Sequence, residues 1–131
     1  MRYLIVDDNA SFRAEMRGLL VEQGLEVVGE AASVAEGLRQ IAELRPDVAL
    51  VDIDLGGESG FEPARRLSKE PRDGAAPYVI LISTYDEAEY ADLIRASSAI
   101  GFLAKSELSA ASVRRMLASI DGDEADEAQL V

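Results

Sequence analysis

The chain has 131 residues, 48% of them hydrophobic, and carries 13 Lys and Arg against 25 Asp and Glu, a formal charge of −12. This length suits one domain with its own core, and the excess of acids disfavours binding to nucleic-acid phosphates. Cysteine is missing from the sequence, which excludes disulfides and thiolate metal sites. The sequence also lacks a run of about 18 apolar residues, so we expect a cytoplasmic protein without a membrane span.

Strand and helix patterns alternate five times along residues 1–120, which is typical of an α/β domain. Short apolar runs predict parallel strands buried on both faces, at 2–7, 25–31, 48–52, 78–83 and 99–103. Helical spacing of apolar residues predicts helices at about 10–23, 34–45, 61–69, 87–97 and 109–120. The remaining segment, 121–131, contains five acids and no base, which predicts an acidic, disordered tail.

The ends of three helices are marked in the sequence. Asp8 or Asn9 can cap the first helix and Gly24 can end it, while Ser33 can cap the second helix and Pro46 can stop it. Ser109 is the expected cap of the last helix. The residues expected to face the core are Phe12, Met16, Leu19 and Leu20 in the first helix, Val34, Leu38, Ile41 and Ala42 in the second, and Val113, Met116, Leu117 and Ile120 in the last.

The handedness of the crossovers restricts how these units connect. The order that best fits the pattern is 2-1-3-4-5, in a single doubly wound, five-stranded parallel sheet with five helices. The second strand, 25–31, is more polar than the others and is expected at an edge. In this order the first and third strands are neighbours.

Acidic residues follow those two neighbouring strands. Asp7 and Asp8 come after the first strand, and Asp52 ends the third. In an open parallel sheet the carboxyl ends of the strands form the ligand crevice, so the three carboxylates should converge there. Like charges held so close repel and raise one another's pKa values. A hard divalent cation with oxygen ligands would offset that repulsion.

Two further polar side chains follow the last two strands. Ser83 ends the fourth strand, and Lys105 comes almost directly after the fifth. Acids, a hydroxyl and an ammonium at successive strand ends suit a phosphoryl group carried on an aspartate. The hydroxyl could donate a hydrogen bond to one phosphoryl oxygen, and the ammonium could pair with another.

With these residues in this order, the chain resembles the receiver domain of response regulators in two-component signalling, over residues 1 to about 120. The resemblance implies a flavodoxin-like fold and a protein that catalyses only its own phosphorylation and dephosphorylation. Further matching positions are Gly60, Phe102 and the segment Gly-Phe-Leu-Ala-Lys at 101–105.

The resemblance assigns a role to each matching position around the phosphorylation site. Asp52 would be the phosphoacceptor, supplied by a phosphohistidine on a sensor histidine kinase or by a small acyl phosphate. Asp8 would bind Mg²⁺ directly, Asp7 would place the ion through water, and the backbone carbonyl of Asp54 would complete the protein ligands. Lys105 would bridge to the phosphoryl group.

A switch pair is implied as well. The hydroxyl of Ser83 would move toward the phosphoryl group, and the ring of Phe102 would turn into the space it leaves. This change would alter the surface formed by the fourth helix, fifth strand and fifth helix, which would bind a partner protein or an output domain. We favour a stand-alone receiver over an excised one. A homodimer could form on phosphorylation, through the fourth and fifth helices or through the first and fifth.

The sequence departs from the family pattern in several places. Gly56 stands where the family usually has proline, which should loosen the loop 53–60, and Ser106 follows the lysine where many members have proline. Thr84 replaces a smaller residue and could narrow access to the acyl phosphate. Asp54 and Tyr85 could tune the phosphoryl lifetime by ordering or blocking the attacking water.

Two other functions remain open at this point. A phosphatase of the haloacid dehalogenase type also uses a nucleophilic aspartate, an acid two residues later, a hydroxyl and a lysine. Its motifs occur in a different order, and 131 residues leave no room for its cap domain. The other alternative is a degenerate receiver that acts by binding alone.

Overall fold

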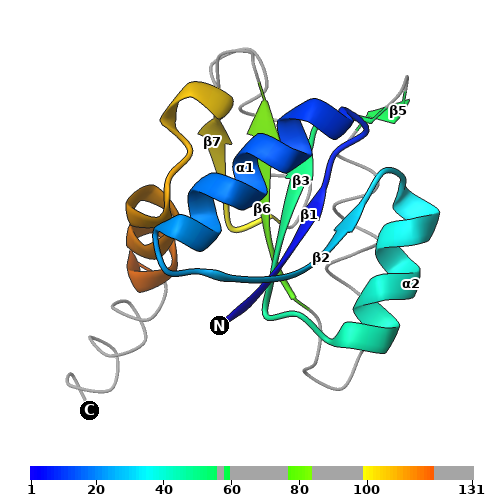
Figure 1. Ribbon diagram of the computed structural model, residues 1–131, viewed down its shortest axis with the longest axis horizontal. Coiled ribbons are helices and arrows are strands. Elements are labelled where there is room, and N and C mark those ends of the chain that lie inside the picture. The colour runs from blue at the N-terminus through cyan, green and yellow to red at the C-terminus, as the bar shows by residue number, and fades with distance from the viewer. Residues whose placement is uncertain (56–57, 60–76, 84–98, 120–131) are drawn as a thin grey trace.

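The computed structural model describes residues 1–55, 58–59, 77–83 and 99–119 of the chain (Figure 1). Its centre is a five-stranded parallel sheet in the order β2-β1-β3-β6-β7. The strands are β1 (Arg2–Val6), β2 (Glu26–Ala31), β3 (Val48–Asp52), β6 (Tyr78–Ser83) and β7 (Gly101–Ala104). This arrangement confirms the predicted order 2-1-3-4-5, including the edge position of the second strand.

Three of the five predicted helices lie within the described residues. They are α1 (Ala10–Glu22), α2 (Val34–Leu44) and a helix at residues 110–119, which follows a short 3-10 turn, η2 (Lys105–Glu107). The helices predicted at 61–69 and 87–97 and the tail 121–131 fall outside the described residues. No helix in the described part of the chain is long and apolar enough to cross a membrane.

The helix ends follow the capping signals in the sequence. Asn9, rather than Asp8, caps α1, and its Oδ1 accepts a hydrogen bond from the backbone N–H of Phe12 at 3.0 Å. Gly24 follows α1 with φ of 97°, a conformation that glycine adopts without steric cost. Ser33 caps α2 through the N–H of Glu36.

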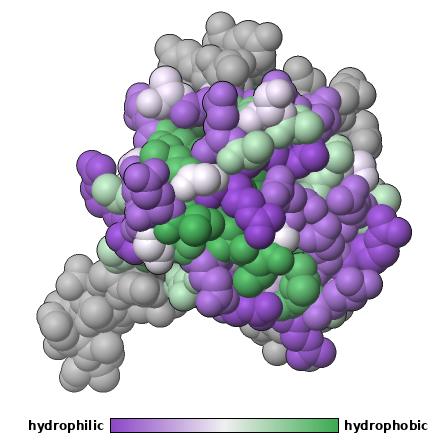
Figure 2. All heavy atoms as spheres, viewed as in Figure 1, coloured by the Kyte–Doolittle hydropathy of each residue, from purple (hydrophilic) through white to green (hydrophobic). Residues whose placement is uncertain are grey.

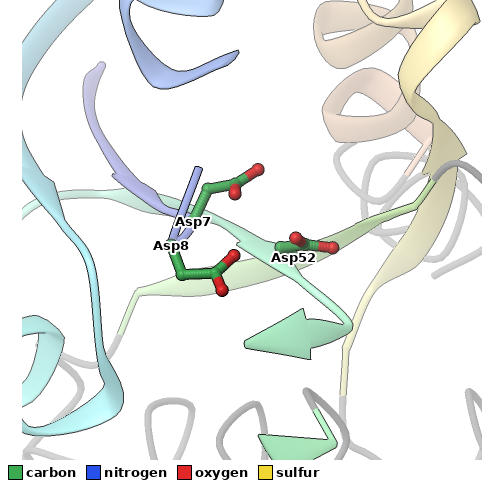
Figure 3. A group of neighbouring side chains, drawn as sticks. All are labelled: Asp7, Asp8 and Asp52. Carbon is green, nitrogen blue, oxygen red and sulfur yellow. The ribbon is translucent and has the colours of Figure 1, made fainter. Parts of the chain in front are cut away.

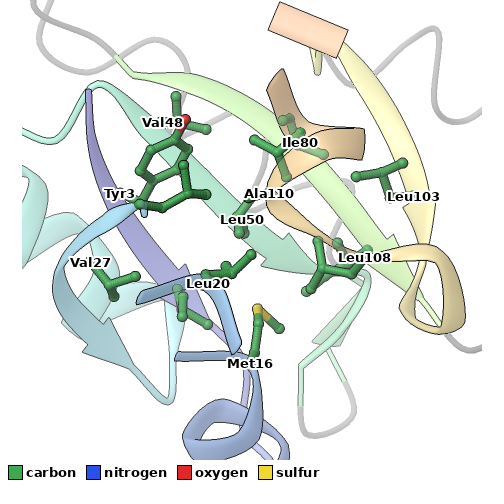
Figure 4. Packing of buried hydrophobic residues seen from close by; sticks show 14 of the residues in the cluster. Tyr3, Met16, Leu20, Val27, Val48, Leu50, Ile80, Leu103, Leu108 and Ala110 are labelled. Carbon is green, nitrogen blue, oxygen red and sulfur yellow. The ribbon is translucent and has the colours of Figure 1, made fainter. Parts of the chain in front are cut away.

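Hydrophobic residues pack against both faces of the sheet, as expected for a doubly wound fold. On one face, Met16 and Leu20 of α1 (Figure 4) belong to one cluster with alternate strand residues. Val113 and Leu117 of the helix 110–119 belong to the same cluster. Those strand residues are Tyr3, Ile5, Val48, Leu50, Ile80, Ile82 and Leu103. The opposite face packs Val34 and Ile41 of α2 against the intervening positions, Leu4, Val6, Ala49, Val51, Val79, Leu81 and Phe102.

Two helix positions predicted to face the core are instead exposed. Leu19 of α1 keeps 39% of its surface exposed, because Met16 and Leu20, one turn apart, form the buried stripe and Leu19 lies beside it. Ala42 of α2 is exposed for the same reason, beside the buried Ile41. Hydrophobic residues on the α1 side of the molecule accordingly form separate areas among hydrophilic ones (Figure 2).

The segment after β3 differs from the glycine-bearing loop that the sequence predicted for 53–60. Strands β4 (Asp54–Leu55) and β5 (Glu58–Ser59) pair in antiparallel register, with Asp54 opposite Ser59. In the sequence, Gly56 and Gly57 stand between these two strands. The hairpin starts two residues beyond Asp52.

Candidate functional site

Three carboxylates meet at the carboxyl edge of the sheet, where β1 and β3 end side by side (Figure 3). One oxygen from each of Asp7, Asp8 and Asp52 lies within 4.8 Å of the others. Asp7 has an exposed fraction of 0% and Asp52 of 5%, whereas Asp8 is exposed. The predicted convergence of these side chains is therefore present, with two of them buried and the third at the solvent side.

Lys105 is the cation that ion-pairs with this cluster in the described part of the chain. Its Nζ lies 3.1 Å from Oδ2 of Asp7 and 3.4 Å from Oδ2 of Asp52, and its side chain is only 14% exposed. Side chains along a strand alternate between the two faces of the sheet, and this explains why these three side chains meet. Asp7 is in phase with Tyr3 and Ile5, Asp52 with Val48 and Leu50, and Lys105 with Leu103. These apolar residues all belong to the cluster on the α1 face. Period-two alternation thus brings all three side chains to one face.

The turn from β1 into α1 fixes the backbone around Asp7. Its N–H donates to the carbonyl oxygen of Ala31 on β2, and its Oδ1 accepts from the N–H of Asn9, both at 2.9 Å. Nη1 of Arg13 donates to the carbonyl oxygen of Asp7 at 2.6 Å. Asp7 is therefore held by its own side chain, by the neighbouring strand and by the first turns of α1.

The donor set fits a hard divalent cation. Oδ2 of Asp7 is buried and makes no hydrogen bond in the described structure, although it lies beside the Lys105 ammonium. A buried carboxylate oxygen without a hydrogen bond is costly unless a cation or a charged group satisfies it. Carboxylate oxygens at one edge of a sheet are ligands that Mg²⁺ prefers. Asp7, Asp8 and Asp52 could hold such an ion.

The other predicted site residues lie near this edge or outside the described residues. Ser83 ends β6 with 1% of its surface exposed, one residue beyond Ile82, which pairs with Asp52. Phe102 is also buried. In the pairing of β6 with β7, Phe102 lies opposite Leu81, and Ser83, two residues after Leu81, lies opposite Ala104. Ser83 and Phe102 therefore belong to the same face of neighbouring strands.

Four predicted positions, Asp54, Gly60, Thr84 and Tyr85, are described only in part or lie outside the described residues. The backbone of Asp54 begins β4, so its position lies directly after the site. Its predicted role as a carbonyl ligand stays a prediction. Thr84 and Tyr85, proposed to tune the phosphoryl lifetime, lie outside the described residues, as does Gly60.

Two residues near the site were not identified from the sequence. Phe12 places its ring over the Lys105 ammonium, with Nζ 4.1 Å from the ring centroid, although it was predicted only as a core residue. Arg13 was not singled out, yet it links the Asp7 carbonyl to Glu30, whose carboxylate it contacts at 3.3 Å. Both residues lie in the first turns of a helix that starts directly after the acidic pair, and this position is the feature of the sequence that could have identified them.

Comparison with known proteins places this chain among the response regulators. Residues 3–118 match the response regulator receiver domain family. An uncharacterized response regulatory protein of Vibrio cholerae is 36% identical over 118 residues, which are 87% of this chain and 47% of that protein. The transcriptional regulatory protein BtsR of Escherichia coli is 38% identical over 88 residues, which are 66% of this chain and 35% of BtsR. The chain thus spans less than half the length of these curated relatives.

Solved structures agree with the sequence comparison. A two-component response regulator of the LuxR family from Aurantimonas superimposes with a TM-score of 0.76 at 30% identity, over 92% of this chain and 85% of that structure. The likeness extends over most of both chains.

Proposed function

The chain belongs to the response regulator receiver domain family, whose members act in two-component signalling, and from this premise we propose that Asp52 is its phosphoacceptor. The observation that carries the proposal is the charge arrangement around Asp52. This buried carboxylate has two further carboxylates within 4.8 Å and the Lys105 ammonium at 3.4 Å. A carboxylate beside an ammonium group and a cation-binding edge of the sheet suits acceptance of a phosphoryl group.

The proposed reaction is a phosphoryl transfer to the Asp52 carboxylate. One Oδ of Asp52 forms a bond to phosphorus as the phosphorus–nitrogen bond of a phosphohistidine breaks, and the electron pair of that bond returns to the imidazole nitrogen. With a small acyl phosphate as donor, the bond that breaks is the one from phosphorus to the acyl oxygen. The phosphoryl group would then lie between Asp52 and Lys105, and the Lys105 ammonium is near enough to pair with one of its oxygens.

Mg²⁺ is the proposed cofactor, which the carboxylates of Asp8 and Asp52 and the carbonyl oxygen of Asp54 would bind directly, while Asp7 would place the ion through water. The ion would offset negative charge on the phosphoryl oxygens. Asp7 has little freedom to move because its backbone and Oδ1 are both hydrogen-bonded. The chain therefore presents a fixed ligand edge, with the exposed Asp8 on the side from which the ion enters.

The signal would leave the site through β6 and β7. Ser83 would donate its hydroxyl hydrogen to a phosphoryl oxygen, and Phe102 on the same face would adjust to its movement. Asp54, Thr84 and Tyr85 would set how quickly water removes the phosphoryl group. The changed surface would bind a downstream partner or an output domain, as a population shift between two conformations.

The intact mass of the protein after incubation with acetyl phosphate and Mg²⁺ tests this function. We expect one added phosphoryl group on the natural chain and none on Asp52→Asn, because an amide lacks the nucleophilic carboxylate. An equal adduct on both proteins would show that a residue other than Asp52 is the acceptor. An unmodified natural chain, with Mg²⁺ binding demonstrated and a purified histidine kinase also tried as donor, would favour the degenerate receiver that acts by binding alone.

A further inference from the structure

We propose that Phe12 is a positioning residue that holds Lys105 against the buried carboxylates and thereby sets the Mg²⁺ concentration at which the site fills. The inference rests on the proposed function, since it concerns the same cation-binding edge. It assigns a role to a ring that the phosphoryl-transfer chemistry does not use. Its starting point is the contact between Nζ of Lys105 and the Phe12 ring, 4.1 Å from the centroid.

Lys105 is enclosed by three groups from three parts of the chain. These groups are Oδ2 of Asp7, Oδ2 of Asp52 and the ring of Phe12. Asp7 follows β1, Asp52 is the last residue of β3, and Phe12 lies in α1. With 14% of its side chain exposed, the ammonium has lost most of its contact with water. A cation over an aromatic face gains more when it is desolvated, so the ring stabilises the lysine in this position.

Phe12 is itself fixed in place by the start of α1. Its N–H donates to the Asn9 cap, and its side chain packs, partly buried, against the core cluster on the α1 face. The next residue, Arg13, ties the same turn to the Asp7 carbonyl oxygen. The ring position is therefore coupled to the backbone that carries the acidic pair.

Lys105 and a divalent cation compensate the same negative charges. Without the metal, the ammonium is the cation that offsets the charge of Asp7 and Asp52 in the described structure. A metal ion on these carboxylates weakens their hold on the lysine. A contact that favours the lysine-paired form and is lost when the metal binds then lowers the metal affinity by the factor that it contributes, because the two equilibria are linked. The Phe12 ring is such a contact.

The test measures Mg²⁺ affinity by NMR titration of amide signals near Asp8 for the natural chain, Phe12→Leu and Phe12→Trp. Leu keeps apolar bulk without an aromatic face, whereas Trp keeps the face. We expect Phe12→Leu to bind Mg²⁺ roughly two- to tenfold more tightly, the range that a lost cation–π contact gives, and Phe12→Trp to stay within about twofold of the natural chain. Phe12→Met replaces Phe12→Leu if the latter fails to fold, as judged by circular dichroism.

A second pair of variants separates positioning from a general change in α1. In a Lys105→Gln background there is no ammonium to hold, so Phe12→Leu should leave the Mg²⁺ affinity unchanged within about twofold. A tightening that persists in that background would show that the ring acts through the helix and would overturn the inference. An unchanged or weaker affinity in Phe12→Leu alone would overturn it as well.

The outcomes also distinguish this inference from the proposed function. If the natural chain binds no Mg²⁺ at millimolar concentration, both fail. If it binds Mg²⁺ and accepts a phosphoryl group while Phe12→Leu changes nothing, the proposed function stands and the role of Phe12 fails.

Discussion

Asp7 and Asp52 have almost no exposed surface, with fractions of 0% and 5%, although each carries a carboxylate that water would otherwise solvate. Burial of like charges costs stability, and the Lys105 ammonium between them offsets part of that cost. This cost is expected of a site whose carboxylates are positioned to bind a metal ion and to accept a phosphoryl group. Sites of this kind commonly lower the stability of the fold that carries them.

Replacing Lys105 should reveal that cost. We expect Lys105→Met to lower the free energy of unfolding of the metal-free protein by about 2–4 kcal/mol, because two buried carboxylates lose their paired cation. Urea unfolding at neutral pH measures the change. Mg²⁺ should restore much of the loss, since it compensates the same charges. A variant as stable as the natural chain without Mg²⁺ would show that the ion pairs contribute little. Lys105→Arg, which keeps the charge, is the matched control.

At the scale of elements, strand β7 and the helix 110–119 approach each other closely at Gly101. A Cβ atom built on Gly101 would come within 2.8 Å of Cε and 3.2 Å of Cγ of Met116, which is partly buried against the core. The absence of a side chain at Gly101 therefore permits this packing. Because β7 continues directly into Lys105, the same contact helps to set the position of the lysine at the site.

Gly101→Ala is expected to lower stability by about 1–2 kcal/mol, as overpacking does in a tightly packed core. The cost should be smaller in a Met116→Ala background, where the new methyl group has space. A double-mutant cycle in urea measures the coupling between the two positions. Equal costs in both backgrounds would mean that Met116 already moves aside without penalty.

For the whole molecule, the formal charge of −12 places the acidic site within a chain that repels itself. Monovalent salt should stabilise the fold modestly by screening that repulsion. A divalent ion that binds the site adds a specific gain by mass action, because it binds the folded chain and has no comparable site in the unfolded one.

At a Mg²⁺ concentration about ten times its Kd, we expect a gain of about 1.4 kcal/mol and a rise in Tm of roughly 5 °C above that in NaCl of equal ionic strength. Differential scanning calorimetry measures both. Asp8→Asn should lose this excess while responding normally to NaCl, since Asp8 is exposed and the fold does not depend on it. An excess that survives in Asp8→Asn would place the stabilising ion elsewhere on the acidic surface.

The sequence alone was sufficient to predict the parallel sheet, its strand order and the convergence of Asp7, Asp8 and Asp52. These features depend on short-range signals: apolar runs, crossover handedness and the residue that follows each strand. Local chemistry likewise predicted Ser33 as the cap of α2 and limited the cap of α1 to Asp8 or Asn9, of which the structure has Asn9. The same signals could not tell which of two adjacent helix positions faces the core, so the prediction for Leu19 was wrong.

Only the tertiary structure decided how the charges at that edge are compensated. The 3.1 Å and 3.4 Å contacts of Lys105, the ring of Phe12 above it and the hold of Arg13 on the Asp7 carbonyl join residues about 100 positions apart or on separate elements. Such contacts depend on strand register and helix packing, which arise when the whole chain folds. The sequence therefore determined which chemical groups reach the edge, and the fold determined their distances, burial and neighbours.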